Sequence, residues 1–251
     1  MKKRALVTGA SEGIGYVFAQ RLAAEGYEVT AVARNEENLQ RLMAEIGGGH
    51  SYIAADLTTA AGQDAIMQAI SAAHFDLLIN NAGIAAMGPF TDIPLKRHVE
   101  VLTLNCETVV KLSHAYLKTA TEGDALINVS SALAFMPMPI IGLYSATKAF
   151  VTSFSESLWF EQKPRGVYVM GLCPGITSTK FNEHSGGGTA ATPKLMTETP
   201  EHLVDTALKA LKCRCKPTVI SGAVNNIFTF MSRLMSRKAI ANMMGKMGAK
   251  P

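Results

Sequence analysis

The stretch TGASEGIG at residues 8–15 decides the fold, because it joins a short apolar run to a segment with helical spacing. The run KRALVTG (residues 3–9) has the pattern of a strand that ends in glycine, and residues 14–22 place apolar side chains at helical intervals. Gly9, Gly13 and Gly15 permit a tight turn and a close backbone approach, and the N-terminus of the following helix can receive a pyrophosphate. Glycine-rich turns between strands and helices are often merely structural, so this turn alone does not establish nucleotide binding.

The same alternation of strand and helix patterns continues along the chain. It predicts further strands at 27–33, 51–55, 75–80, 124–130, 167–173 and 217–221, and helices at 12–26, 35–48, 61–73, 95–119, 144–162 and 201–212. Apolar strands that alternate with amphipathic helices indicate a parallel sheet with helices on both faces. We expect an α/β fold, a single-domain, doubly wound Rossmann-type sheet of about seven strands over residues 1–222, with a helical extension over residues 223–251. Three consecutive glycines within residues 182–200 predict a loop.

Composition limits the class of protein. The chain has 251 residues and 48% hydrophobic content, which suffices for one α/β domain with a large core. The sequence contains no apolar run long enough to cross a bilayer, and the basic start leads directly into a strand rather than into a secretory signal. We therefore expect a cytoplasmic protein, in which Cys213 and Cys215 are free thiols.

The charge is unevenly distributed along the chain. Residues 1–205 hold 15 basic residues against all 20 acids, whereas residues 206–251 hold 9 basic residues and no acid. This basic segment is the only support for nucleic-acid binding, which we do not expect because no recognised motif accompanies it.

A second pattern, GLYSATKAF at residues 142–150, places Tyr144 and Lys148 four residues apart at the start of a predicted helix. Both side chains leave the same helical face. Such pairs are common in ordinary surface packing. A nearby lysine would also favour the tyrosinate and bring its pKa down from about 10, so that Tyr144 could act as a general acid or base.

Together these motifs resemble the short-chain dehydrogenase/reductase family over residues 4–221. The resemblance is carried, in this order, by TGASEGIG at 8–15, Asp56-Leu57, NNAG at 80–83, Asn105 in LTLNCET, NVSS at 128–131, the Tyr144–Lys148 pair and CPGITST at 173–179. The glycine spacing T-G-x-x-x-G-x-G differs from the G-x-G-x-x-G of other dinucleotide folds.

The resemblance implies an oxidoreductase with four catalytic residues. They are Asn105, Ser131, Tyr144 and Lys148. Ser131 has the family's spacing to Tyr144, while Ser130 is the competing candidate and has an alternative role in the strand end. Asn105 is a poor helix former within a long helix. It either marks a helix irregularity that holds a water beside Lys148 or is a buried side chain bonded to a neighbouring backbone group.

The family also implies an NADP(H) site. Its contacts would come from the glycine turn (Gly9, Ser11, Glu12, Gly13, Ile14 and Gly15), from Arg34, Asp56, Leu57, Asn81, Ala82 and Gly83, from Tyr144 and Lys148, and from Pro174, Gly175, Ile176, Thr177 and Thr179. No metal is implied. Asn and Gly in the NNAG segment would also serve a turn that ends a strand, and the two roles are compatible.

The predicted preference for NADP over NAD depends mainly on Arg34. Enzymes that select NAD usually place an acid at the end of the second strand, and here that position holds Ala33, followed by Arg34. A guanidinium can bind the 2′-phosphate of NADP, which a carboxylate would repel. Glu12 stands where many NADP-binding relatives carry a basic residue, so the preference depends mainly on Arg34. Its alternative role is a surface ion pair with Glu36 or Glu37.

The predicted substrate is a small hydrophobic ketone or secondary alcohol, 3-oxoacyl or steroid-like in kind. The segment ALAFMPMPIIGL between Ser131 and Tyr144 has no charge, and Met87 and Phe90 are further candidates for the wall of the pocket. Ordinary packing under a loop explains these residues equally well. A non-catalytic NADP-binding sensor or scaffold is the alternative function, although such a protein would be expected to have lost one of the four catalytic residues.

The basic segment 225–247 repeats apolar residues at helical spacing and has three candidate uses besides docking on its own body. A lid or a subunit contact ranks above attachment to an anionic membrane surface. The family resemblance implies a homodimer or homotetramer.

Overall fold

A seven-stranded parallel sheet forms the centre of the protein, as the sequence predicts. The computed structural model describes residues 2–179, 181, 185 and 197–248. The strands lie in the order β3-β2-β1-β4-β5-β6-β9, and every neighbouring pair is parallel. Their bounds are β1 Arg4–Thr8, β2 Glu28–Ala33, β3 Ser51–Ala54, β4 Leu77–Asn80, β5 Ala125–Val129, β6 Tyr168–Cys173 and β9 Thr218–Ile220.

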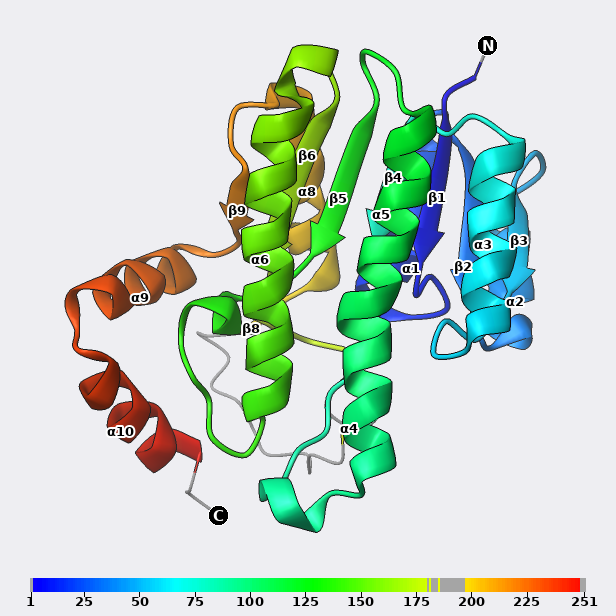
Figure 1. Cartoon of the computed structure of the whole chain (residues 1–251). Helices are drawn as coiled ribbons and strands as arrows, with labels where there is room; N and C mark the ends of the chain where they lie inside the picture. The colour runs from blue at the N-terminus through cyan, green and yellow to red at the C-terminus, as the bar shows by residue number, and fades with distance from the viewer. Residues whose placement is uncertain (1, 180, 182–184, 186–196, 249–251) are drawn as a thin grey trace.

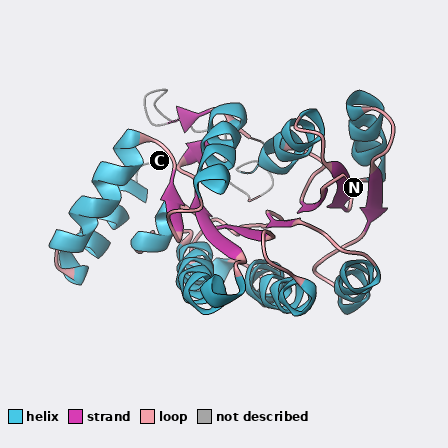
Figure 2. Ribbon diagram, turned by 90° about the horizontal axis from the view of Figure 1, so that it is seen from above, coloured by secondary structure: helices cyan, strands magenta, loops and turns pink. Residues whose placement is uncertain are grey.

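Helices cover both faces of this sheet (Figures 1 and 2). On one face lie α1 (Gly13–Ala24), α2 (Glu36–Ile46) and α8 (Pro200–Cys213), and on the other α3 (Ala60–Ala72), α5 (Thr108–Thr119) and α6 (Gly142–Gln162). Each layer has its own core, one around Phe18 of α1 and one around Leu112 of α5. Because both faces are covered, the central strands are buried along nearly their whole length and are mostly apolar.

The reversal of strand order sets the position of the site. From β1 the chain winds outward to β2 and β3, and from β4 it winds the other way to β5, β6 and β9. In doubly wound sheets ligands bind beyond the carboxyl ends of the strands at this point of reversal. The turn after β1 and the NNAG segment after β4 lie there, side by side.

The predicted long helix at 95–119 is interrupted near its middle. Helix α4 (Leu95–Leu102) passes through a π-helical turn at Thr103–Glu107 into α5. Asn105 lies in this turn, so the prediction of an irregularity at Asn105 is confirmed. Single π turns of this kind are often found at functional sites.

A short two-stranded sheet was not predicted. It pairs β7 (Ile176–Thr177) with β8 (Thr197–Glu198), immediately after β6 and before α8. The predicted loop at 182–200 lies mostly outside the described residues, and its end at 197–200 forms β8 and the start of α8.

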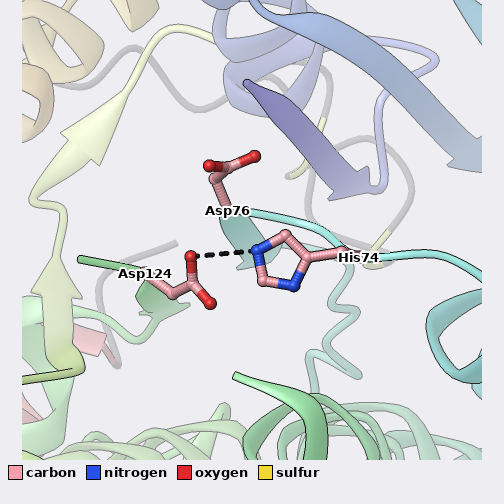
Figure 3. A group of neighbouring side chains, drawn as sticks. All are labelled: His74, Asp76 and Asp124. Atoms are coloured by element: carbon pink, nitrogen blue, oxygen red, sulfur yellow. Dashed lines mark ion pairs between the residues drawn. The ribbon is translucent and has the colours of Figure 1, made fainter. Parts of the chain in front are cut away.

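His74, Asp76 and Asp124 lie together at the opposite end of the sheet, and Figure 3 shows the His74 ring facing the Asp124 carboxylate. Asp76 accepts a hydrogen bond from the Arg4 amide at 2.7 Å, and Asp124 accepts one from the Thr121 amide at 2.6 Å. The His74 ring lies 3.3 Å from the second oxygen of Asp124. Since these carboxylates accept from backbone amides at the start of β1 and in the turn before β5, we assign the cluster a structural role.

Cys213 and Cys215 form a disulfide at the end of α8, so the prediction of two free thiols is wrong. The intervening Arg214 adopts a left-handed backbone conformation with φ 53°, and the two Cα atoms lie 5.4 Å apart. The sequence spacing alone does not reveal this turn. Cys106 and Cys173 are free.

The chain continues into α9 (Ala223–Leu234) and α10 (Arg237–Gly248), which lie beside the sheet and beyond α6 (Figure 1). Among the described helices, none is both long and apolar enough to cross a bilayer. The boundary at residue 222 between a catalytic domain and an extension stays a prediction.

Candidate active site

Tyr144 and Lys148 lie on the first two turns of α6, next to the carboxyl end of β5. The Lys148 ammonium group donates a hydrogen bond of 2.8 Å to the carbonyl oxygen of Val129, the last residue of β5. It lies over the Tyr144 ring, 5.5 Å from the ring centre. The predicted neighbouring pair is therefore present, with Lys148 buried at 4% exposure and Tyr144 partly buried.

Ser131 and Ser130 have different surroundings, which separates the two candidates. The Ser131 hydroxyl lies beside Tyr144, where it lowers the pKa of the phenol. The Ser130 hydroxyl is buried, donates to the Lys148 carbonyl oxygen at 2.7 Å and bonds to Thr152. Ser130 thus anchors α6 to the end of β5, whereas Ser131 faces the phenol.

Asn105 is fully buried and reaches from the π turn to the segment after β4. Its side-chain oxygen accepts from the Ile84 amide at 3.0 Å, and its nitrogen donates to the Ile84 carbonyl at 2.9 Å and to Thr147 at 3.0 Å. The alternative of a buried side chain bonded to a neighbouring backbone group is therefore present in the structure. The side-chain oxygen and the Lys148 ammonium lie 3.4 and 3.3 Å from the place where a Cβ on Gly83 would stand, so the two groups converge on Gly83.

The turn after β1 requires its glycines. Gly9 has φ +67°, and a Cβ on it would stand 2.8 Å from the Asn81 amide nitrogen. A Cβ on Gly15 would overlap the Gly9 carbonyl. The Asn81 side chain donates to the Thr8 and Gly9 carbonyls at 2.9 and 3.2 Å, which fixes NNAG against the turn. Glycine is therefore required at positions 9 and 15 by the packing of the turn against the NNAG segment.

Other predicted contact residues surround this turn. Ser11, Glu12 and Ile14 belong to the turn and the start of α1, and α1 begins at Gly13. The Asp56 carboxylate, after β3, accepts from the Thr58 amide and hydroxyl at 2.9 and 2.8 Å. Leu57 beside it is buried.

The segment after β6 closes the other side of the site. The Pro174 carbonyl accepts from the Ala132 amide at 2.7 Å, which joins this segment to the chain that follows Ser131. Thr179 lies against Gly13, since a Cβ there would stand 3.1 Å from its methyl group. Ile176 and Thr177 form β7 and pair with β8. The structure thus brings the glycine turn and the Pro174–Thr179 segment together.

Comparisons with known proteins agree with this arrangement. A family model described as short chain dehydrogenase matches residues 3–188. The chain is 29% identical to the very-long-chain 3-oxoacyl-CoA reductase of Homo sapiens, over 95% of this chain and 78% of that protein. It is 32% identical to the 17-beta-hydroxysteroid dehydrogenase type 3 of Danio rerio, over 84% and 70%. The structure of a short-chain dehydrogenase from Sphingobium yanoikuyae in complex with NADPH superposes with a TM-score of 0.82, at 30% identity, covering 92% and 94% of the two chains.

The chain belongs to the short-chain dehydrogenase family. It is an oxidoreductase that uses a nicotinamide cofactor. The family's turn and NNAG segment are the parts that the structure locks together around Gly9 and Gly15.

Arg34 lies at the end of β2, where this short-chain dehydrogenase has no acid. Ala33 is the last residue of β2 and is buried, and Arg34 is exposed. Asn35 caps α2 by accepting from the Asn38 amide at 2.9 Å. Within the part of the chain that the structure describes, no ion pair joins Arg34 to Glu36 or Glu37. The proposed surface pair is therefore not observed.

The ionisation of the pair differs from the sequence prediction. Burial raises the pKa of Tyr144 to about 12, although the Ser131 hydroxyl acts in the opposite direction. Burial likewise lowers the pKa of Lys148 to about 8. The prediction that the lysine charge would bring the tyrosine pKa down is wrong for this structure, because desolvation of the phenol dominates.

Sequence reasoning missed three residues. The Phe181 ring packs on Tyr144 with 5.4 Å between the ring centres, Thr147 joins Asn105 to the Tyr144 carbonyl, and Asn225 of α9 packs on Gly175. Thr147 could have been found from helical spacing, but Phe181 and Asn225 come from segments whose folding the sequence does not reveal. Of the predicted wall residues, Met87 is partly buried, whereas Phe90 is 67% exposed and stacks on His98.

Proposed function

We propose that the protein is an NADPH-dependent reductase of hydrophobic ketones, with the reverse alcohol oxidation as its other direction. The observation that carries this proposal is the convergence of Ser131, Tyr144 and Lys148 at the carboxyl end of β5. This point lies beside the glycine turn, which joins the carboxyl end of β1 to the N-terminus of α1, the place where dinucleotides bind in doubly wound sheets. The cofactor, when bound, supplies the hydride.

The four polar residues have distinct proposed roles. Tyr144 is the general acid, and its raised pKa keeps it protonated at neutral pH and ready to donate to a carbonyl oxygen. Ser131 donates a hydrogen bond to the same oxygen. Lys148 is the cation beside the phenol, and Asn105 positions the segment after β4 and lies close to Lys148.

The preference for NADP over NAD is supported by Arg34 and Ala33. The exposed Arg34 guanidinium at the end of β2 can bind a 2′-phosphate with paired hydrogen bonds. Position 33 holds an alanine, so it has no carboxylate that would repel the phosphate. The NADPH complex of the similar Sphingobium yanoikuyae enzyme supports the same choice.

The proposed substrate class is a 3-oxoacyl or steroid-like ketone. The uncharged segment between Ser131 and Tyr144 includes a short helical turn at Ala132–Phe135, and Met136 in it is buried with Ile240 and Met244 of α10. Phe181 adds a ring next to Tyr144. Similarity to a very-long-chain 3-oxoacyl-CoA reductase and to a 17-beta-hydroxysteroid dehydrogenase supports a substrate of this kind.

We also propose that the protein is a homodimer or homotetramer. Exposed apolar side chains on the outer faces of α5 and α6, Val110, Phe150 and Phe160, support this proposal. Light scattering after gel filtration measures the mass, and Phe160→Arg should lower it if α6 is the contact.

The decisive experiment is a carbonyl substrate panel followed by the loss of NADPH absorbance. Wild-type protein should reduce at least one hydrophobic ketone, and Tyr144→Phe should turn over at least about a hundredfold more slowly with NADPH affinity nearly unchanged. Tyr52→Phe, on β3 and remote from β5, is the matched control and should keep full turnover. Full turnover by Tyr144→Phe would exclude its role as the acid, and binding of NADPH without any turnover by the wild type would favour the sensor or scaffold alternative.

A further inference from the structure

Helix α9 presents its apolar side chains to solvent. Val224, Ile227, Phe230, Met231 and Leu234 are between 41% and 70% exposed. Their spacing of three and four residues places them on one side of the helix, which we name the α9 stripe. A helix that docks on its own body normally buries such a stripe, so its exposure requires an explanation.

The side of α9 that faces the protein carries two buried polar side chains and one partly buried aromatic side chain, Phe228, which packs against the cluster of Met136, Ile240 and Met244. Thr229 and Ser232 are only 3% and 7% exposed. Each satisfies its hydroxyl on the helix itself, Thr229 by donating to the Asn226 carbonyl at 3.0 Å and Ser232 by donating to the Thr229 carbonyl at 2.8 Å. The apolar contact of α9 with the body is thus made by Phe228, and the residues of the α9 stripe are not part of that cluster.

Other contacts hold α9 and α10 in place. At the start of α9, Asn225 donates to the Ser221 carbonyl at 2.7 Å and Asn226 to the Ile220 carbonyl at 2.9 Å. In α10, Ile240 and Met244 are buried against Met136 of the uncharged segment. The stripe is thus exposed on a helix that is anchored at both ends, and both helices lie at the margin of the molecule (Figures 1 and 2).

The charges next to the stripe are all positive. Arg233 lies in the last turn of α9, Arg237 and Lys238, both exposed, are the first two residues of α10, and residues 206–251 contain no acid. A contact between the stripes of two copies would bring two cationic segments into one interface, and residues 206–251 supply no acid to pair with them. An anionic lipid surface has the opposite charge and attracts each such cation by about 1 kcal/mol.

The length of α9 is suited to lying on a bilayer and not to crossing it. It has 12 residues, whereas a spanning helix needs about 20. Apolar side chains on one side and adjacent arginine and lysine are the properties of helices that lie in the headgroup region. We propose that the α9 stripe is a docking face for an anionic membrane surface. This inference is independent of the proposed reductase activity.

Vesicle sedimentation with the full-length protein tests the proposal. Phosphatidylcholine vesicles that contain phosphatidylserine should carry down the wild-type protein, and vesicles of phosphatidylcholine alone should carry down much less. The triple variant Ile227→Ser, Phe230→Ser, Leu234→Ser should bind the anionic vesicles at least about tenfold more weakly. The control Leu95→Ser removes an equally exposed apolar side chain, 75% exposed on α4, and should bind like the wild type.

A second pair of variants tests whether the positive charges of Arg237 and Lys238 cause the preference for anionic vesicles. Arg237→Glu with Lys238→Glu should abolish the preference for phosphatidylserine, whereas Lys96→Glu, an exposed lysine on α4, should leave it intact. Added salt should weaken binding of the wild type. Thermal unfolding checks that each variant is folded, which is expected since all the altered side chains are exposed.

Three results would overturn the proposal. They are equal binding to both kinds of vesicle, equal losses in the stripe and Leu95 variants, and no vesicle binding at all. If the stripe variants instead lower the mass measured by light scattering, while the wild type ignores vesicles, the stripe is a contact between copies.

Discussion

The Lys148 ammonium lies over the face of the Tyr144 ring, 5.5 Å from its centre, and donates its 2.8 Å hydrogen bond to Val129. The cation therefore faces the π system, and its attraction for the phenolate oxygen does not offset burial. Burial shifts the two pKa values in opposite directions: it raises the pKa of Tyr144 to about 12 and lowers the pKa of Lys148 to about 8. A protonated phenol beside a lysine that titrates near neutrality is suited to reduction.

The rate of ketone reduction should depend on pH through Lys148. Below pH 8 both groups are protonated, so Tyr144 can donate its proton while the neighbouring cation stabilises the phenolate that remains. As pH rises through about 8, Lys148 loses its charge and kcat/KM should fall. Oxidation needs the phenolate, so it should still increase with pH beyond 9. Initial rates in both directions from pH 6 to 10 measure this, and a pH-independent reduction rate would contradict it.

Lys148→Met should stabilise the protein while abolishing turnover. The folded-state pKa is lowered from 10.5 to about 8, a shift worth about 3 kcal/mol at neutral pH, less about 1 kcal/mol for the lost bond to Val129. Between pH 8 and 10.5 the unfolded lysine binds a proton that the folded one does not, so wild-type stability rises with pH. The advantage of the variant should therefore shrink from pH 7 to pH 10 in urea unfolding. An advantage that stays constant would mean that the charge of Lys148 is not the cause.

Arg34→Ala should weaken NADPH binding far more than NADH binding. Loss of a paired guanidinium–phosphate contact should cost NADPH about tenfold to a hundredfold in affinity, since hydrogen bonds to charged groups contribute about 1.5–3 kcal/mol. NADH has no 2′-phosphate and should bind almost as before. Arg41→Ala is the control, because it removes an exposed arginine that lies on α2 and not at the end of β2. Fluorescence titration of both cofactors measures the ratio, and equal losses for both would remove the basis for NADP preference.

Gly15→Ala should prevent cofactor binding and destabilise the fold. The new Cβ would overlap the Gly9 carbonyl and stand 2.5 Å from the Asn81 amide nitrogen, so the turn and the NNAG segment would have to separate. We expect a loss of at least about 2 kcal/mol in the free energy of unfolding. Gly48→Ala has no atom within 4 Å of the new Cβ and is the matched control. Unfolding and NADPH titration of the two variants should differ sharply; similar behaviour would show that the turn tolerates a side chain.

The sequence was sufficient for the features that depend on local pattern. The seven strands follow from apolar runs buried on both faces, and the irregularity at Asn105 follows from a poor helix former within a long apolar helix. These two properties are encoded within a few neighbouring residues. The preference for Ser131 over Ser130 came instead from the family resemblance, through the spacing of the serine to Tyr144.

Features that depend on distant packing could not be predicted. The Tyr144 pKa is raised mainly by the desolvation of the phenol in the folded protein. The charged residues near Tyr144 in the sequence do not show how strong this desolvation is. Helical spacing showed that α9 has an apolar side, but not that this side faces solvent while Thr229 and Ser232 face inward. The left-handed Arg214 that joins Cys213 to Cys215 is likewise a property of the folded turn.

The contact between Gly175 and Asn225 links the segment after β6 to α9. It predicts that a substitution at Gly175 can be compensated by a second substitution at Asn225. A Cβ on Gly175 would overlap the Asn225 amide, so Gly175→Ala should displace the segment that is proposed to contact the nicotinamide. NADPH affinity and kcat should both fall, by about tenfold or more. The backbone at Gly175 is not in the left-handed region, so the cause is purely steric.

Asn225→Gly introduced into the Gly175→Ala variant should restore NADPH affinity and kcat substantially, because it removes the overlapping amide. Gly142→Ala, with open space at its Cβ, should change neither quantity. A double variant as weak as Gly175→Ala alone would show that the overlap with Asn225 is not what excludes a side chain at this position.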